Sequence, residues 1–144
     1  MFRKFAAATA LFCLGLTALT GCSGKLSTEE TCDYLNQQIK EREINMKFET
    51  GDIKLAKGET GDYESALEEF DAMLKDTAGK TGDKQLQESL ISAAGQSTSA
   101  LKILADDSSD FKAQMESISE LNTASQQQNT EYLGTACPNL DSVG

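Results

Sequence analysis

The chain has 144 residues and is strongly acidic, with 13 Lys and Arg against 23 Asp and Glu and a formal net charge of −10. This charge disfavours nucleic acid as a partner, because phosphate binding needs clustered basic residues, and it disfavours electrostatic docking on anionic lipid. The sequence contains no His, so it lacks the usual general base near neutral pH and the commonest neutral metal ligand.

The first 21 residues have the layout of a signal peptide. Arg3 and Lys4 precede an apolar run over residues 5–19, and no acidic residue occurs before Glu29. The run is 15 residues long, shorter than the roughly 20 residues that cross a bilayer as a helix, so a permanent transmembrane segment is disfavoured. Cleavage after Gly21 would leave 123 residues, in which 11 basic residues face 23 acidic ones, a balance of −12.

The apolar run ends in Leu19-Thr20-Gly21-Cys22, which resembles the lipobox of bacterial lipoproteins. The resemblance implies a diacylglyceryl group on the Cys22 thiol, cleavage between Gly21 and Cys22, and Cys22 as the new N-terminus. Two acyl chains would hold the domain lastingly on the extracytoplasmic face of a cell membrane. The other interpretation is an ordinary secretory leader in which Cys22 is incidental.

The mature part contains Ser27-Thr28-Glu29-Glu30-Thr31-Cys32 near its start and Thr135-Ala136-Cys137-Pro138 close to its C-terminus. With the lipobox, this layout resembles the small uncharacterised lipoproteins of actinobacteria and related Gram-positive bacteria, a family that implies no activity. We therefore expect a cleaved signal peptide over residues 1–21, a lipidated tether over 22–27, a helical domain over 28–140 and a tail over 141–144.

Four amphipathic helices are expected in the helical domain. A capping box of Ser27 and Glu30 starts the first, which is predicted over residues 28–49. Its apolar stripe consists of Cys32, Leu35, Ile39 and Met46, flanked by Ile44 and Phe48. Three glycines follow, so residues 50–62 are interpreted as a loop that includes a short helical or extended piece around residues 53–56.

The second helix is predicted over residues 62–78, ended by Gly79. The third is predicted to span about 22 residues and to end near Asp106. Ser108 or Ser109 can cap the fourth, which Pro138 stops. The apolar stripe of this fourth helix thins between residues 122 and 130.

Two cysteines, Cys32 and Cys137, remain after Cys13 leaves with the leader and Cys22 takes lipid. Outside the cytoplasm thiols tend to be oxidised, which favours a disulfide between them. Four helices with modest connections favour an antiparallel up-down four-helix bundle, in which the start of the first helix meets the end of the fourth. The predicted fold is therefore an all-α bundle closed by an N-to-C-terminal disulfide. The alternative is two free thiols or a redox pair, although no C-x-x-C spacing is present.

Two acidic clusters are candidates for a cation site. One lies on the second helix and one between the third and fourth; they consist of Glu64, Glu68, Glu69 and Asp71, and of Asp106, Asp107 and Asp110. A solvated helix face explains the first cluster, and capping of helix ends explains the second. Because no acidic loop has the spacing of a calcium site, no metal and no cofactor is expected.

Two further segments are candidates for binding. The middle of the third helix is rich in small residues, which suits close helix packing or a shallow pocket; they are Gly95, Ser97, Thr98, Ser99 and Ala100. The polar middle of the fourth helix, Gln126-Gln127-Gln128-Asn129, either faces solvent or offers amide groups to a partner. With no His to activate a Ser or Thr, an enzyme is not expected.

The sequence thus predicts a non-catalytic, membrane-anchored extracytoplasmic lipoprotein that binds or stabilises another component of the cell envelope, protein or polymer. The membrane contact is the lipid on Cys22. The alternative is a small-molecule carrier or sensor with a pocket between helices. A cavity lined by Phe70, Met73, Leu90 and Met115 would favour this alternative. The sequence does not indicate the oligomeric state.

Overall fold

The structure, a computed structural model, describes residues 24–106, 110–121 and 123–140. Gly21 and Cys22, the predicted cleavage and lipidation site, lie outside these ranges, as do Asp107, Ser108 and Ser109. Within the described ranges the chain forms six helices: α1 (Thr28–Glu41), α2 (Ile44–Leu55), α3 (Gly61–Lys80), α4 (Lys84–Leu104), α5 (Phe111–Ser119) and α6 (Ala124–Ala136). The predicted all-α class is therefore confirmed. Over this part of the chain, no helix has both the length and the apolar character needed to cross a bilayer.

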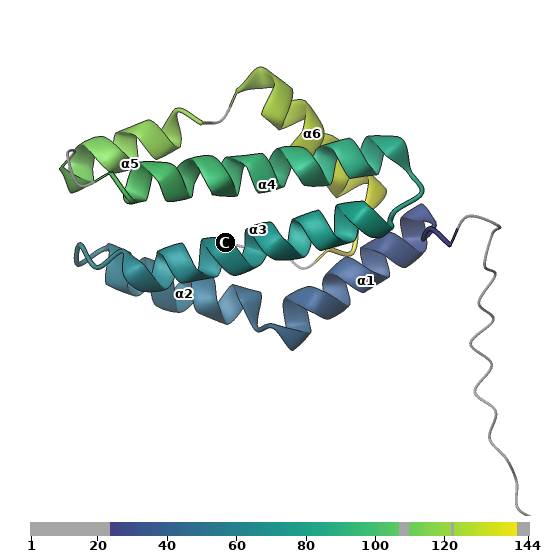
Figure 1. Ribbon diagram of the computed structural model, residues 1–144, viewed down its shortest axis with the longest axis horizontal. Coiled ribbons are helices and arrows are strands. Elements are labelled where there is room, and N and C mark those ends of the chain that lie inside the picture. Colours follow the sequence, from purple (N-terminus) through teal and green to yellow (C-terminus); the bar gives the residue numbers. More distant parts are fainter. Residues whose placement is uncertain (1–23, 107–109, 122, 141–144) are drawn as a thin grey trace, which may run out of the picture.

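Helices α3 and α4 form a hairpin at the centre of the bundle (Figure 1). Helix α2 packs on α3, while α5 and α6 pack on α4, and α1 contacts α2, α3 and α6. The hairpin corresponds to the second and third predicted helices. It differs from them in small details, since α3 continues through Gly79 to Lys80 and α4 ends at Leu104.

The prediction of one continuous helix over residues 28–49 is wrong, because the structure has two helices there, α1 and α2. The helix is interrupted at Arg42 and Glu43, and Glu43 adopts a left-handed conformation with φ of 54°. This break changes the phase of the apolar stripe, so Ile44 and Phe48 are buried while Met46, predicted in the stripe, is 52% exposed. The left-handed residue thus turns a second apolar face toward the core.

The predicted loop over residues 50–62 is shorter than expected, because α2 runs on to Leu55. Gly51 was expected to end a helix, but it is buried within α2. A Cβ atom at this position would lie only 2.9 Å from the Cα atom of Tyr63 on α3. A glycine is therefore needed for α2 and α3 to approach each other this closely.

The fourth predicted helix is also two elements. Asp110 caps α5 through a hydrogen bond from the Ala113 N–H, and Thr123 begins α6 with a capping box that includes Gln126. The break between them falls where the apolar stripe thins. Capping signals within the expected helix therefore decide where the chain interrupts it.

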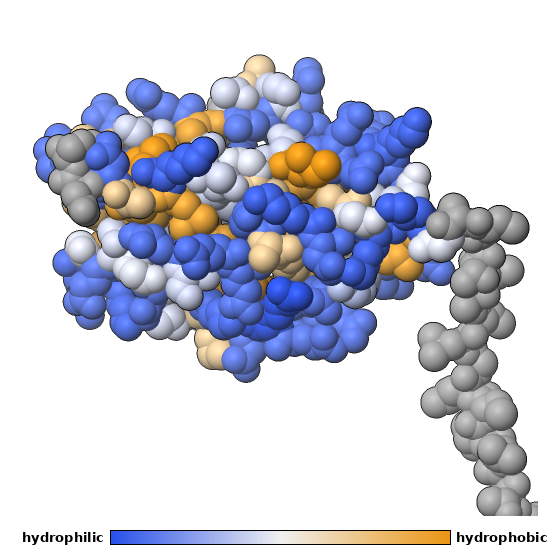
Figure 2. All heavy atoms as spheres, viewed as in Figure 1, coloured by the Kyte–Doolittle hydropathy of each residue, from blue (hydrophilic) through white to orange (hydrophobic). Residues whose placement is uncertain are grey.

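The buried core comes mainly from the first four helices. Its apolar side chains include Leu35, Ile39, Ile44, Phe48, Ala66, Leu67, Met73, Leu74, Ala78, Leu86, Leu90, Ala94, Ala100 and Leu104. Helices α5 and α6 and the segment between them add only partly buried apolar side chains, among them Met115, Ile118, Leu121, Tyr132 and Leu133. The face seen in Figure 2 is mostly hydrophilic, and its hydrophobic spheres lie mainly along α4 and its seam with α3.

One end of the bundle is held by cross-links between distant segments; we call it the tied end and define it by residues 25–32, 79–86 and 132–137. The structure joins Cys32 of α1 to Cys137, directly after α6, in a disulfide with the two Cα atoms 5.4 Å apart. Leu26 pairs with the turn between α3 and α4 through backbone hydrogen bonds of 2.8 Å to Lys80 and Gly82. The chain is thus fixed to the bundle immediately before α1.

Asp83 joins several segments at the tied end. Its carboxylate caps α4 by accepting hydrogen bonds from the N–H groups of Gln85 and Leu86, at 2.9 and 3.0 Å. It also accepts hydrogen bonds from the hydroxyls of Thr28, at 2.8 Å, and Tyr132, at 3.1 Å. These bonds, led by those from Leu86 and Thr28, lower the pKa of the Asp83 carboxyl below its usual value.

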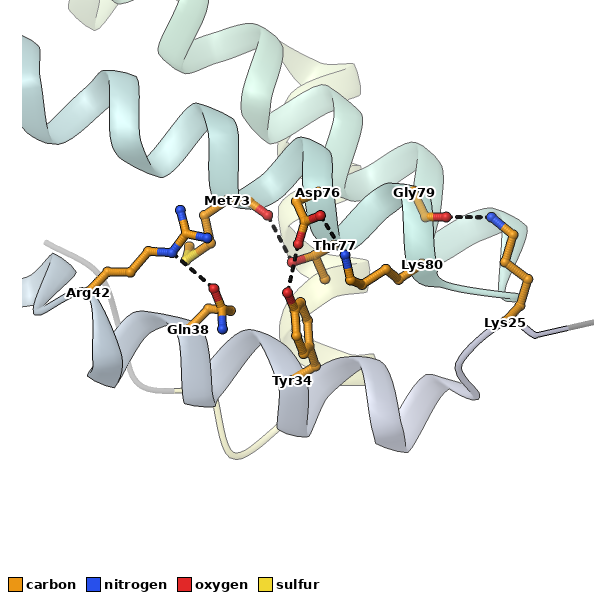
Figure 3. Close-up of polar contacts among 9 residues, drawn as sticks. All are labelled: Lys25, Tyr34, Gln38, Arg42, Met73, Asp76, Thr77, Gly79 and Lys80. Atoms are coloured by element: carbon orange, nitrogen blue, oxygen red, sulfur yellow. Dashed lines mark hydrogen bonds and ion pairs between the residues drawn. The ribbon is translucent and has the colours of Figure 1, made fainter. Parts of the chain in front are cut away.

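A polar contact between α1 and α3 lies beside this end (Figure 3). The Tyr34 hydroxyl donates to Asp76 at 2.7 Å, and the Lys80 ammonium pairs with the same carboxylate while lying 5.3 Å from the centre of the Tyr34 ring. The hydrogen bonds from Lys80 and then from Tyr34 lower the pKa of Asp76. Lys25 donates to the Gly79 carbonyl, which adds a further link to the end of α3.

Candidate functional site

A groove of about 580 Å³ opens in the half of the bundle away from the tied end. Helices α2 and α3 form one wall, α5 and α6 form the other, and α4 contributes the side chains between them. The lining residues are Phe48, Asp52, Tyr63, Leu67, Phe70, Ala93, Gln96, Ser97, Ala100, Ile118, Leu121, Gln127, Thr130 and Glu131. We call this feature the groove.

Three aromatic rings line the wall formed by α2 and α3. The ring centre of Phe48 lies 5.6 Å from that of Tyr63 and 5.7 Å from that of Phe70, with interplanar angles of 72° and 85°. Such edge-to-face packing is favourable and holds the rings in fixed orientations. The left-handed break at Glu43 places Phe48 in this cluster, because it turns that face of α2 toward α3.

Small side chains of α4 leave the volume of the groove unfilled. Ala93, Ser97 and Ala100 are spaced by four and three residues, so they lie on one face of the helix. Ser97 and Ala100 belong to the small-residue segment for which the sequence left close packing and a shallow pocket open. In the structure both residues are buried and also line the groove, whereas Gly95 is exposed.

The groove has a polar and acidic rim. Gln127, from the polar middle expected to face solvent or a partner, lines the groove with Thr130 and Glu131 of α6. Asp52 of α2 lies on the other wall, and no Lys or Arg is among the lining residues. Burial, and next the negative charge of Asp52, raise the pKa of the Tyr63 hydroxyl, which therefore stays protonated at neutral pH.

The cavity expected from the sequence had a different lining. Of the four residues named for it, only Phe70 lines the groove. Met73 and Leu90 are fully buried in the core, and Met115 packs against the core from α5. Helical periodicity identified these side chains as inward-facing, but it does not distinguish a packed side chain from one beside an open volume.

Two members of the first acidic cluster have structural partners. Glu69 pairs with Lys47, and Asp71 pairs with Lys75 and accepts a hydrogen bond from Thr98 at 3.0 Å. Among the described residues, no group of three or more His, Cys, Asp or Glu side chains is placed to hold a metal ion.

In the second cluster, Asp110 caps α5 as the capping interpretation predicts. Asp107 lies outside the described residues. The groove is therefore the feature of the described chain that is best suited to bind another molecule.

Comparison with known proteins adds no family. No family model matches the sequence, and neither a curated protein nor a solved structure is similar to it.

Proposed function

We propose that this protein is a lipid-anchored, extracytoplasmic binding protein, without catalytic activity, whose groove takes up a small molecule with an apolar body. The observation that carries the proposal is the groove of about 580 Å³ with its aromatic wall. Small-molecule sites typically enclose about 300 to 1,000 Å³ and combine an apolar lining with a few polar groups. The volume and lining of this groove agree with that pattern.

The proposed anchor would set the orientation of the groove relative to the membrane. Cys22 would carry the lipid, and only Ser23 and Gly24 separate it from Lys25, which is already bound to the end of α3. A tether this short would hold the tied end at the membrane surface. The groove, formed by the opposite halves of α3 and α4, would then open away from the membrane.

We further propose that the bundle has up-down four-helix topology with two interrupted arms. Helices α1 and α2 form one arm, and α5 and α6 form the other, on either side of the α3–α4 hairpin. In this arrangement the interruptions are useful for binding, because each changes the direction or phase of an arm beside the groove.

Binding of an envelope protein or polymer, the leading expectation from the sequence, has less support. The exposed large apolar side chains of the described chain are Met46, Ile53, Ile91 and Phe111. They are spread over α2, α4 and α5. Scattered exposed apolar residues are normal on protein surfaces, so they do not indicate a docking surface.

A fluorescent probe tests the proposed binding site. The neutral dye N-phenyl-1-naphthylamine should bind at one saturable site and brighten as it leaves water. Ala93→Trp fills the groove from α4 and should weaken binding by about tenfold or more, since each tenfold corresponds to about 1.4 kcal/mol. Ala72→Trp places the same side chain at an exposed position of α3 and should leave binding unchanged. Equal binding by both variants would contradict the proposal.

Mass spectrometry tests the proposed address. The membrane-extracted protein should have the mass of residues 22–144 plus acyl chains, with Cys32 and Cys137 resistant to alkylation until reduction. Cys22→Ala should abolish the acyl mass and release the protein from the membrane. A wild-type mass without acyl chains would contradict the proposed lipid anchor.

A further inference from the structure

The charge of the groove restricts what it can bind. Its lining contains two carboxylates, Asp52 on α2 and Glu131 on α6, and no basic side chain. The two lysines of α2 nearest in sequence to Asp52 are engaged elsewhere, because Lys54 pairs with Asp62 and Lys47 with Glu69. Among the described residues, neither groove carboxylate has an ion-pair partner. The negative charge at the rim is therefore not neutralised within the described chain.

The Tyr63 hydroxyl adds a polar group to the same region. Tyr63 is only partly exposed, its ring belongs to the aromatic wall, and its hydroxyl has no hydrogen-bond partner among the described residues. Asp52 lines the same groove from α2, and its negative charge contributes to the raised pKa of the Tyr63 hydroxyl. A ligand that reaches them meets an acceptor-rich, negatively charged site beside aromatic rings.

We propose that the molecule taken up by the groove is an amphipathic organic cation, whose apolar body lies against the aromatic wall and small α4 side chains while its protonated amine lies at the rim near Asp52 and Glu131. This inference rests on the proposed binding function and names its ligand class. Asp52 and Glu131 are exposed, so attraction between opposite charges at the rim favours a cation by the modest amount typical of exposed ion pairs. An acid of the same length would instead bring a third carboxylate to Asp52 and Glu131, so the groove disfavours fatty acids and other anionic amphiphiles.

Three chain-matched probes test the ligand class on the full-length protein. Decylammonium and decanoate below their micelle concentrations, and decanol below its solubility limit, would compete with N-phenyl-1-naphthylamine at neutral pH. One exposed ion pair contributes up to about fivefold in affinity. We expect decylammonium to bind most tightly, decanol next and decanoate most weakly, with up to about 25-fold between decylammonium and decanol if both carboxylates contribute.

A pair of matched variants separates the groove from the general acidity of the chain. Asp52→Asn with Glu131→Gln should abolish the preference for decylammonium over decanol. Asp33→Asn with Glu88→Gln removes the same charges from exposed positions on α1 and α4 and should keep the preference. If the preference survives in the groove variant, or if decanoate binds as tightly as decylammonium, the cation proposal is wrong. Dye binding that stays sensitive to Ala93→Trp would, in that case, still support the proposed binding function.

Discussion

The tied end and the groove end of this bundle share helices α3, α4 and α6, yet different interactions hold them together. We define the groove end as residues 44–72, 93–106, 110–121 and 123–131. At the tied end a disulfide, a backbone bridge and the Asp83 carboxylate connect segments that are more than 45 residues apart in the chain. At the groove end, the contacts are apolar packing and polar bonds between neighbouring segments.

The polar bonds of the groove end do not cross it. Lys47 and Lys54 of α2 pair with acidic residues of α3. Gln114 of α5, which is buried, donates to the carbonyls of Leu104 and Asp106 at 3.2 and 3.0 Å and so holds α5 to the end of α4. Between described residues, no side-chain hydrogen bond or ion pair joins α2 or α3 to α5 or α6.

This difference shows how a small domain can keep an open volume. An unfilled groove forfeits packing energy, because the side chains along it lack partners. Cross-links concentrated at the other end stabilise the fold without filling the groove. A movement of the two walls apart or together would break no side-chain polar bond between described residues.

Among the interactions of the tied end, the disulfide should contribute most to the free energy of unfolding. Replacing Cys32 and Cys137 with Ser removes a cross-link that spans 105 residues of sequence. The free energy of unfolding should fall by about 4 kcal/mol, mainly because the unfolded chain gains conformational freedom. Urea denaturation of the oxidised, reduced and Ser-substituted proteins measures this loss. Equal midpoints in all three would show that the tied end does not depend on the disulfide.

The second largest contribution to the free energy of unfolding should come from Asp83. Asp83→Ala removes the cap of α4 and leaves the hydroxyls of Thr28 and Tyr132 without their acceptor. The loss should be about 2 kcal/mol, made up of a lost cap and lost charge-assisted hydrogen bonds at a partly exposed site. Asp110→Ala is the matched control, because Asp110 only caps α5, and it should cost about 1 kcal/mol. Equal losses would mean that Asp83 acts only as a cap.

Asp83 also predicts how stability depends on pH. Its pKa in the folded protein is lowered, so its contribution is fully present above the unfolded value, about 3.9, and is lost as the pH falls through the folded value. Unfolding experiments from neutral to acidic pH should therefore show a steeper loss of stability in the wild type than in Asp83→Asn. Parallel curves would contradict the role of this carboxylate.

A methyl group at Gly51 should perturb the groove end alone. Its Cβ atom would meet the Cα of Tyr63 at 2.9 Å, so α2 must shift from α3 in Gly51→Ala. Overpacking of this kind costs about 1 to 3 kcal/mol, and we expect about 1.5 kcal/mol because the groove beside it leaves room to move. Dye affinity should fall as the Phe48 ring moves, while Cys32 and Cys137 remain protected from alkylation. Gly95→Ala, where no atom lies within 4 Å of the added Cβ, is the control.

The tied end is the part of the fold that the sequence predicts best. Cysteine count and helix topology both bring Cys32 near Cys137, and the Ser27 capping box marks where α1 begins. The capping box is a local sequence motif, and the number of remaining cysteines can be counted directly from the sequence. The central hairpin was also predicted, since long amphipathic helices bounded by glycines and caps carry a strong periodic signal.

The groove end was predicted less well, for physical reasons. A non-glycine residue in a left-handed conformation, as at Glu43, has no sequence signal comparable to a glycine or proline. If the helix is assumed to be continuous through Glu43, Phe48 is assigned to the wrong helix face. The sequence therefore does not predict the aromatic wall of the groove. Gly51 was misread because a glycine that permits close packing looks in sequence like one that ends a helix.

Tyr34→Phe should have the smallest effect on the tied end. The substitution removes the hydrogen bond to Asp76 but keeps the ring beneath Lys80, which still pairs with Asp76. The site is exposed, so the free energy of unfolding should fall by only about 0.5 kcal/mol. The Asp76 pKa is the sharper measurement. It should rise toward its usual value in Tyr34→Phe, and rise further in Lys80→Met, because the bond from Lys80 lowers it more than the bond from Tyr34. A carboxyl-detected NMR titration that ranks the two variants in the opposite order would show that the hydroxyl of Tyr34 on α1, and not Lys80 on the same helix as Asp76, lowers the pKa of this carboxylate most.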